Sequence, residues 1–291
     1  MGAAFPGDVD YLVFSVNRGR FGVPHFNVVS VMDLPPHTSV PYMPPEVRGI
    51  IPFRETSIPL VDLRVSFGLT ARTLETQELI ANMAARKQDH INWVNKLKDE
   101  VLNSKPITVQ TNPHLCAFGK WYDKFETDNG NLGAFMKRFD DPHQQIHRVG
   151  VEAARLIQQG KNEQAVSLIR STESGVLVRL LELFDGIEGV VHKYLLEYAI
   201  IVVAGGSQFA IAVDDINFFS RLEEIEHPLP TGISGENSDL VQGIARYQDD
   251  TTGERRDVLL LDLNRIVNRI GDSGTFEEEE GEGTVRASVT A

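Results

Sequence analysis

The sequence predicts a multidomain α+β protein in which a helical segment interrupts a β-rich one. Residues 9–70 and 199–271 contain short β-branched runs separated by Gly, Pro and Asn turns, whereas residues 71–198 carry apolar side chains at helical spacing. A length of 291 residues allows two modest domains. The simplest explanation is one domain inserted into a loop of another, because an antiparallel four-helix bundle returns its two ends to the same side.

The first β-rich part, residues 9–70, is expected to form several short strands. A turn at Asn17-Arg18-Gly19-Arg20 should join the first two into a hairpin. Prolines at positions 35, 36, 41, 44 and 45 predict a loop before the next strands. The expected strands cover residues 11–16, 21–23, 28–32, 47–51 and 58–63.

The middle part, residues 71–198, predicts a helical bundle. Its first helix ends near Pro106 and carries one apolar stripe that includes His90, so this imidazole should face the core. A short helix should run from Cys116 to about Phe125. Pro142 suits the first turn of a third helix, and a last helix should begin near Asn162 and continue towards residue 196.

The β pattern returns in residues 199–271, with expected strands at 200–204, 208–213 and 257–263 and a closing helix near 265–270. The remaining residues, 272–291, form an acidic tail with four consecutive glutamates, Glu277 to Glu280. Low hydrophobicity and high charge predict disorder in this tail, together with Gly271.

Four residues in the helical part form a candidate metal site: His90, Cys116, His143 and His147. His143 and His147 are four residues apart, which places both imidazoles on one helix face. Three imidazoles and one thiolate are a ligand set that tetrahedral Zn²⁺ prefers. The spacing is too long for a zinc finger and suits separate helices that meet in one core. His114 could substitute for a ligand, but a loop histidine is the simpler interpretation.

These motifs resemble the chemoreceptor zinc-binding domain, a four-helix bundle of bacterial signalling proteins. The resemblance covers His90-Ile91-Asn92-Trp93, Cys116-Ala117-Phe118-Gly119-Lys120-Trp121-Tyr122 and His143-Gln144-Gln145-Ile146-His147. It implies that His90, Cys116, His143 and His147 are the zinc ligands. The family is associated with responses to zinc and to oxidation, including oxidation by hypochlorous acid, so Cys116 is also the candidate redox-sensing residue.

The two β-rich parts, once joined, resemble the CheW-like domain of chemotaxis coupling proteins. The resemblance rests on residues 11–16, 47–63, 209–214 and 259–262. It implies a CheW-like double SH3-like β-barrel, with two five-stranded barrels on a shared apolar core, interrupted by an inserted antiparallel four-helix bundle. The implied domains are 9–70 and 199–271 for the host and 71–198 for the insertion.

One departure from the CheW-like pattern concerns the segment Pro52-Phe53-Arg54-Glu55, where the family usually has Asn-Leu-Arg-Gly. Arg54 is kept and is the candidate partner-binding residue. Glu55 replaces the glycine, so its backbone must adopt an ordinary angle. Asp62 and Asp214 match motif aspartates, which are expected to cap strand ends or turns.

Composition limits the function classes. A net charge of −13 argues against nucleic acid and anionic membranes as partners. No apolar run approaches the roughly 20 residues that span a bilayer, and the N-terminus lacks signal-peptide features. A single cysteine excludes an intrachain disulfide and fits the cytoplasm.

The expected function is therefore a signalling scaffold and not an enzyme. No phosphate-binding loop, nucleophile elbow or His-Glu-x-x-His helix is present. The resemblance implies coupling of chemoreceptors to the chemotaxis histidine kinase, modulated by zinc or redox sensing. Two alternatives are a scaffold with a purely structural zinc and a zinc hydrolase, which would need an open coordination position. Pairing of bundles would give a homodimer.

Overall fold

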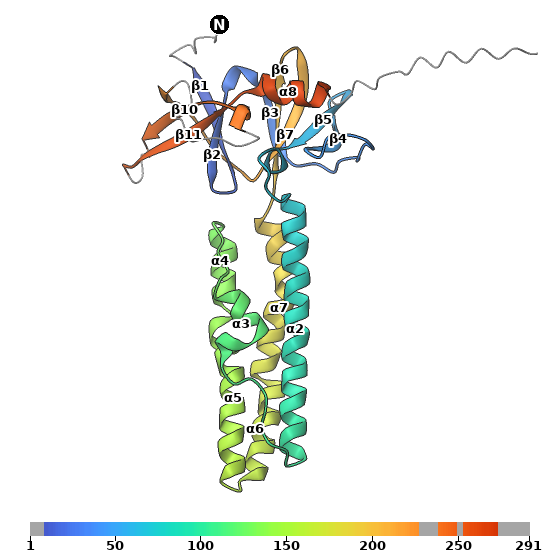
Figure 1. The fold of residues 1–291 in the computed structure, drawn as a ribbon, viewed down its shortest axis with the longest axis vertical. Helices are drawn as coiled ribbons and strands as arrows, with labels where there is room; N and C mark the ends of the chain where they lie inside the picture. Colours follow the sequence, from blue (N-terminus) through green and yellow to red (C-terminus); the bar gives the residue numbers. More distant parts are fainter. Residues whose placement is uncertain (1–8, 227–237, 249–252, 273–291) are drawn as a thin grey trace, which may run out of the picture.

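A computed structural model describes residues 9–226, 238–248 and 253–272 of the chain. It shows a β-rich head from which a bundle of helices extends as a stalk (Figure 1). The predicted disordered tail lies outside the described residues from 273 onwards. Its first residue and the preceding Gly271 are part of the last helix, so the helix continues further than expected.

The elements follow one another in the order strands, helices, strands. The strands are β1 Asp10–Val16, β2 Gly19–Pro24, β3 Val28–Asp33, β4 Val47–Phe53, β5 Thr56–Asp62, β6 Tyr198–Ala204, β7 Ser207–Val213, β8 Asp215–Arg221, β9 Glu223–Glu226, β10 Val241–Gln248 and β11 Arg255–Leu261. The helices are α1 Leu63–Ser66, α2 Arg72–Leu102, α3 Ala117–Tyr122, α4 Gly130–Lys137, α5 Asp140–Gln158, α6 Asn162–Ser174, α7 Val176–Tyr194 and α8 Leu263–Asp272. Within the described ranges, no helix has the length and apolar character needed to cross a membrane.

Strands from both sides of the helical part pair in the same two sheets. The six-stranded sheet has the order β8-β1-β2-β11-β10-β9, and the five-stranded sheet has the order β3-β6-β7-β5-β4. Each contains one parallel pair that joins the two parts, with Phe21 opposite Leu259 and Leu60 opposite Ala210. The β-rich head therefore needs both sequence parts. Two five-stranded barrels were implied by the resemblance; the short β9 is the additional strand of the larger sheet.

The chain leaves and re-enters the head at two neighbouring junctions. The buried Arg48 of β4 binds Asp62 at the end of β5 at 2.7 Å and Glu197, which precedes β6, at 2.5 Å. Asp62 also accepts a hydrogen bond from the Val65 backbone N–H at 3.2 Å and so caps α1. The predicted capping role of Asp62 is confirmed, and the ion pair with Arg48 adds to it.

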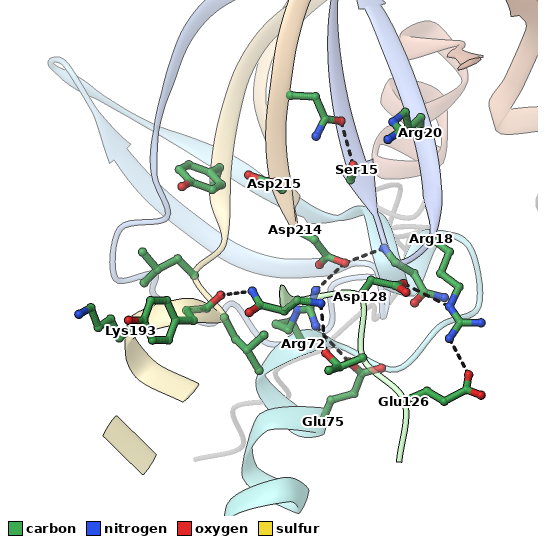
Figure 2. A pocket seen from close by; sticks show the side chains of 18 residues that line it. Ser15, Arg18, Arg20, Arg72, Glu75, Glu126, Asp128, Lys193, Asp214 and Asp215 are labelled. Carbon is green, nitrogen blue, oxygen red and sulfur yellow. Dashed lines mark hydrogen bonds and ion pairs between the residues drawn. The ribbon is translucent and has the colours of Figure 1, made fainter. Parts of the chain in front are cut away.

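A second set of ion pairs joins the head to the first turn of α2. Asp214, at the end of β7, binds buried Arg64 at 2.6 Å and Arg72 at 2.8 Å, and it accepts the Asn17 backbone N–H at 2.6 Å. Arg64 also binds Glu75 in α2. Asp214, Arg72 and Glu75 border a cleft of about 910 Å³ between head and helices (Figure 2). Buried charges of the head thus bind charged residues of the helical part at both junctions.

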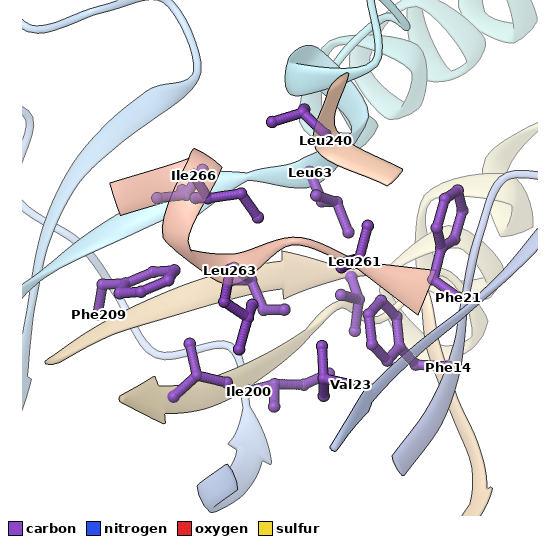
Figure 3. Packing of buried hydrophobic residues seen from close by; sticks show 14 of the residues in the cluster. Phe14, Phe21, Val23, Leu63, Ile200, Phe209, Leu240, Leu261, Leu263 and Ile266 are labelled. Carbon is purple, nitrogen blue, oxygen red and sulfur yellow. The ribbon is translucent and has the colours of Figure 1, made fainter. Parts of the chain in front are cut away.

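The largest apolar cluster lies between the two sheets and draws on both sequence parts. Figure 3 shows Phe14 and Phe21 beside Leu261, with Phe209 and Ile266 at the other end of the cluster. Each of these side chains is at most 5% exposed. Burial of aromatic and branched side chains stabilises a fold by about 1.5–3 kcal/mol each before entropy is considered. This shared core explains why neither β-rich part is a separate folding unit.

The helical part has its own core and differs from the expectation in three places. Cys116 is the N-cap of α3, which ends at Tyr122, so the short helix neither contains Cys116 nor reaches Phe125. An additional helix, α4, precedes α5 and is capped by the Asn129 side chain. The expected last helix is divided into α6 and α7 at Gly175, whose φ of −120° and ψ of −96° are not helical.

We predict that the head folds without the stalk. Replacing residues 72–195 by a short Gly-Ser linker keeps every described strand and the Arg48 pairs with Asp62 and Glu197. The expected product shows a β-type circular dichroism spectrum and one cooperative unfolding transition. A matched deletion of residues 72–204, which also removes β6 from between β3 and β7, should not fold. Aggregation of the first product with several linker lengths would count against the insertion.

Candidate metal centre

His90 lies on the buried face of α2, as its apolar stripe predicted, with Met83, Val94, Leu97 and Val101. Its Nδ1 is 2.8 Å from the Arg86 carbonyl one turn earlier. A carbonyl oxygen can only accept a hydrogen bond, so Nδ1 carries the proton and Nε2 has a free lone pair. That Nε2 is buried and has no hydrogen-bond partner in the described part of the chain.

His143 and His147 project from one face of α5 towards His90. His147 repeats the arrangement of His90: Nδ1 is 2.8 Å from the Gln110 carbonyl, and Nε2 is buried without a partner among the described residues. The ring centroids of His143 and His147 are 5.2 and 5.9 Å from that of His90. Two free lone pairs therefore point into one apolar region, where an unsatisfied polar atom costs about 1–3 kcal/mol.

Cys116 completes the group from the N-terminus of α3. Its Sγ is 3.2 Å from His143 Nε2 and accepts the Gly119 backbone N–H at 3.1 Å. The 3₁₀ turn Pro113–Leu115 before Cys116 passes close to α3, and a Cβ at Gly119 would lie 1.9 Å from the Pro113 carbonyl oxygen. Glycine at position 119 is therefore required to bring the sulfur to this place.

The four side chains form one group with the geometry of a metal site. One ligand atom from each residue, His90, Cys116, His143 and His147, lies within 4.8 Å of all the others. The three histidines are at most 5% exposed. The two Nδ1 atoms already have carbonyl partners, whereas the two partnerless Nε2 atoms and the sulfur are donors that a bound metal ion would satisfy. The donor set therefore fits a metal ion.

Burial keeps the imidazoles neutral in the metal-free site. It lowers the pKa of His143 to about 3 and the pKa of His147 to about 4, and it lowers the pKa of His90 as well. Repulsion from the other imidazoles adds to the effect at His143. Burial raises the pKa of the Cys116 thiol, which the backbone N–H groups of Gly119 and Phe118 oppose in part. At neutral pH the histidines can bind a metal at once, whereas the thiol must first lose a proton.

Other candidate residues lie outside this cluster. His114 is exposed and bound to Asp123 at 3.0 Å, in agreement with its interpretation as a loop histidine. Arg54 is exposed in the turn between β4 and β5 and adopts a φ of +55°. Because Arg54 takes the left-handed conformation, Glu55 does not need it, and the loss of glycine there is accommodated.

Spacing alone did not reveal the residues that support the site. The carbonyls of Arg86 and Gln110 hold two of the imidazoles, and any residue type can supply a carbonyl. Arg64 and Arg72 at the junction were also missed. The position of Arg64 two residues after the end of strand β5, next to the apolar Leu63, was the one available indication that a buried charge needs a partner.

Two family models match the chain. The model of the CheW-like domain matches residues 10–105, which include β1 to β5 and all of α2. The model of the chemoreceptor zinc-binding domain matches residues 90–154, a range that begins at His90 and includes Cys116, His143 and His147. The two ranges overlap over residues 90–105, which cover the end of α2 and the three residues after it.

The chain is also similar to individual CheW proteins. The chemotaxis protein CheW of Helicobacter pylori (strain ATCC 700392 / 26695) is 25% identical over 126 residues, which cover 41% of this chain and 76% of that protein. The crystal structure of the scaffolding protein TtCheW from Thermoanaerobacter tengcongensis is similar with a TM-score of 0.38 and 13% identity over 87% of this chain and 88% of that chain. The family matches and the sequence similarity support a CheW-like protein with a chemoreceptor zinc-binding domain.

We predict that the metal-free protein loses stability as the pH falls below about 6.5. His143 and His147 stay neutral in the folded state down to pKa values of about 3 and about 4, whereas unfolded histidines take up protons near pH 6.5. The unfolded state then binds more protons, at a cost of up to about 1.4 kcal/mol per histidine per pH unit. Urea unfolding in chelator at pH 7.5, 6.0 and 5.0 measures the slope.

The control is the double variant His143→Ala, His147→Ala, which is less stable at every pH but should lose less stability between pH 7.5 and 5.0. Equal slopes in the two proteins would show that these imidazoles are not the groups held neutral.

Proposed function

We propose that this protein is a chemotaxis scaffold that couples chemoreceptors to a CheA-type histidine kinase, and that its helical part is an inserted zinc-binding sensor. Three similarities support this proposal: the CheW-like match, the match to the chemoreceptor zinc-binding domain and the similarity to a chemotaxis protein CheW. The observation that carries the sensor assignment is the convergence of three imidazoles and one thiol within 4.8 Å. In this proposal the head binds both the receptor and the kinase, and Arg54 contributes to partner binding.

The boundaries of the proposed domains lie at the two junctions. Residues 9–70 and 199–271 make the CheW-like host with two SH3-like barrels, and residues 71–198 make the inserted four-helix bundle. In this reading, α2 is the first helix, α3 the short second, α4 with α5 the third and α6 with α7 the fourth. Pairing of strands across the helical part supports an insertion.

The proposed ion is Zn²⁺, bound by His90, His143, His147 and Cys116. Zn²⁺ takes four tetrahedral ligands of this kind and needs no redox chemistry of its own. When bound, it would hold Cys116 as a thiolate and connect α2, α3 and α5. Four protein ligands leave no open position for a substrate water, so the arrangement favours a sensor or a structural site over a hydrolase.

The proposed route to the head passes through the ion pairs at the two junctions, whose head-side partners are buried. His90 is on the helix whose first turn carries Arg72 and Glu75, and Asp214 and Arg64 bind these residues from the head. A rotation or shift of α2 would have to rearrange these pairs. Breaking a buried pair is costly because it leaves an uncompensated charge, so two discrete arrangements are favoured over a continuous deformation.

Two input signals suit the site. Zinc occupancy is one, since it neutralises the thiolate and orders the bundle. Oxidation of Cys116 is the other. Hypochlorous acid would transfer its oxygen to the sulfur: an S–O bond forms, the O–Cl bond breaks and chloride leaves, so that a sulfenic acid replaces the thiolate. A closed site of four ligands is also compatible with a purely structural zinc, which the second experiment below distinguishes.

We predict that the protein binds one Zn²⁺ per chain and releases about one proton per ion at pH 7.5. The proton comes from Cys116, whose pKa is raised by burial, while the three histidines are already neutral. Titration calorimetry in two buffers with different ionisation enthalpies measures the proton number. Cys116→Ala should bind more weakly and release no proton. Absence of zinc binding, or the same proton number for both proteins, would contradict the ligand set.

We predict that mild oxidation changes the affinity of the protein for the kinase or receptor by a coupling of roughly 1–3 kcal/mol, or about 5–150-fold. Cys116→Ser should abolish the change, because a hydroxyl is not oxidised to a sulfenic acid and is a poor zinc ligand. Affinity is measured for both proteins before and after treatment with hypochlorous acid, with zinc and with chelator. The same affinity in every state would make the zinc a structural element.

A further inference from the structure

Trp93 lies on α2, three residues after the candidate ligand His90, and its indole N–H donates a hydrogen bond to the Gln110 carbonyl at 2.8 Å. The same carbonyl oxygen accepts the Nδ1–H of His147, also at 2.8 Å. A carbonyl has two lone pairs, and this one uses one for each donor. One backbone atom thus connects Trp93 to a candidate metal ligand on another helix.

The position of this carbonyl decides which nitrogen of His147 can bind a metal. While Nδ1–H donates to Gln110, the proton is kept on Nδ1 and Nε2 is directed into the cluster with His90, His143 and Cys116. If the carbonyl moved away, His147 would lose the partner that fixes its tautomer and ring orientation. Partners of this kind typically change metal affinity by about 10–100-fold when they are removed.

Gln110 lies in a non-helical loop between α2 and the turn that delivers Cys116, so its carbonyl needs to be held from outside the loop. Two side chains of α2 fix the loop. The buried Glu100 carboxylate accepts the Thr108 backbone N–H at 3.0 Å and the Thr108 hydroxyl at 2.5 Å. Trp93 is the second anchor, two residues further along the loop.

The indole of Trp93 is confined between α2, the loop and α5. Its ring centroid is 5.2 Å from that of His147. A Cβ at Gly150 on α5 would lie 3.2 Å from the Trp93 ring and 3.0 Å from the Thr111 methyl group, which is closer than ordinary contact. The absence of a side chain at Gly150 therefore lets the indole and the loop reach this face of α5, next to His147.

We propose that Trp93 is a positioning residue of the metal site: its indole N–H fixes the Gln110 carbonyl, and that carbonyl holds His147 with Nε2 towards the metal. The loop that is fixed in this way also carries Cys116, so Trp93 acts on two of the four ligands. The inference rests on the proposed metal-binding function, but the tautomer of His147 tests it in the metal-free protein as well.

The test compares Trp93→Phe with Trp121→Phe, the same substitution at the other tryptophan of the chain. Trp121 packs against Phe118 and Phe125 in the same helical part, and no hydrogen bond of its indole N–H is found among the described residues. Both variants lose similar volume from the bundle, and only Trp93→Phe loses a bond to Gln110.

Two measurements separate positioning from general destabilisation. Nitrogen-15 NMR of histidine side chains at pH 8, in chelator, should show His147 with its proton on Nδ1 in wild type and Trp121→Phe, and as a mixture of tautomers in Trp93→Phe. Competition with a chromogenic chelator should show zinc binding weakened roughly tenfold or more in Trp93→Phe and within about twofold of wild type in Trp121→Phe.

A third protein tests whether misfolding of Trp93→Phe, and not the loss of its N–H group, explains the effects. Incorporation of 3-benzothienylalanine at position 93 keeps the shape of the ring and replaces N–H by sulfur, and it should reproduce both effects. An unchanged His147 tautomer in this protein, or equal losses of zinc affinity in Trp93→Phe and Trp121→Phe, would overturn the assignment. If wild type binds no zinc, the proposed metal function fails, while the tautomer measurement still decides the role of Trp93.

Discussion

The buried cluster of His90, His143, His147 and Cys116 imposes the constraint on which the helical part depends. Two of its ring nitrogens have free lone pairs in an apolar region and no hydrogen-bond partner among the described residues. An apolar side chain at these positions would avoid that cost, so the arrangement makes physical sense when a cation occupies the centre. The features around it follow from the same requirement: carbonyls of Arg86 and Gln110 set the tautomers, and Gly119 lets the turn that carries the sulfur approach.

A second constraint concerns the connection between the stalk and the head. The two sheets need strands from both sides of the helical part, so the chain must leave the head and return to it within a short distance. Arg48 holds the two ends by binding Asp62 and Glu197, and Asp214 binds the start of α2 through Arg72. Removing one partner of a buried pair such as Arg48–Asp62 costs about 3–5 kcal/mol, so these contacts hold the stalk firmly to the head.

Much of this architecture could be predicted from the sequence, and the exceptions have physical causes. The helical stripe of α2 placed His90 correctly, because burial follows the 3.6-residue period. The i, i+4 spacing of His143 and His147 likewise predicted a shared face. The break at Gly175 was missed, since a glycine within a helical pattern is often tolerated. The ion pairs and the role of Trp93 could not be predicted, because they join residues far apart in sequence through contacts, some of them to backbone atoms, that residue type does not record.

The central claim is that one metal ion is bound by three Nε2 atoms and the sulfur of Cys116. The most direct test is a crystal structure of the zinc-loaded protein with anomalous diffraction measured on both sides of the zinc absorption edge. We expect a single strong peak between α2, α3 and α5, about 2.0–2.1 Å from the Nε2 atoms of His90, His143 and His147 and about 2.3 Å from the sulfur. No peak in this cluster, or a zinc ion bound through Nδ1 or by residues elsewhere in the chain, would contradict the account.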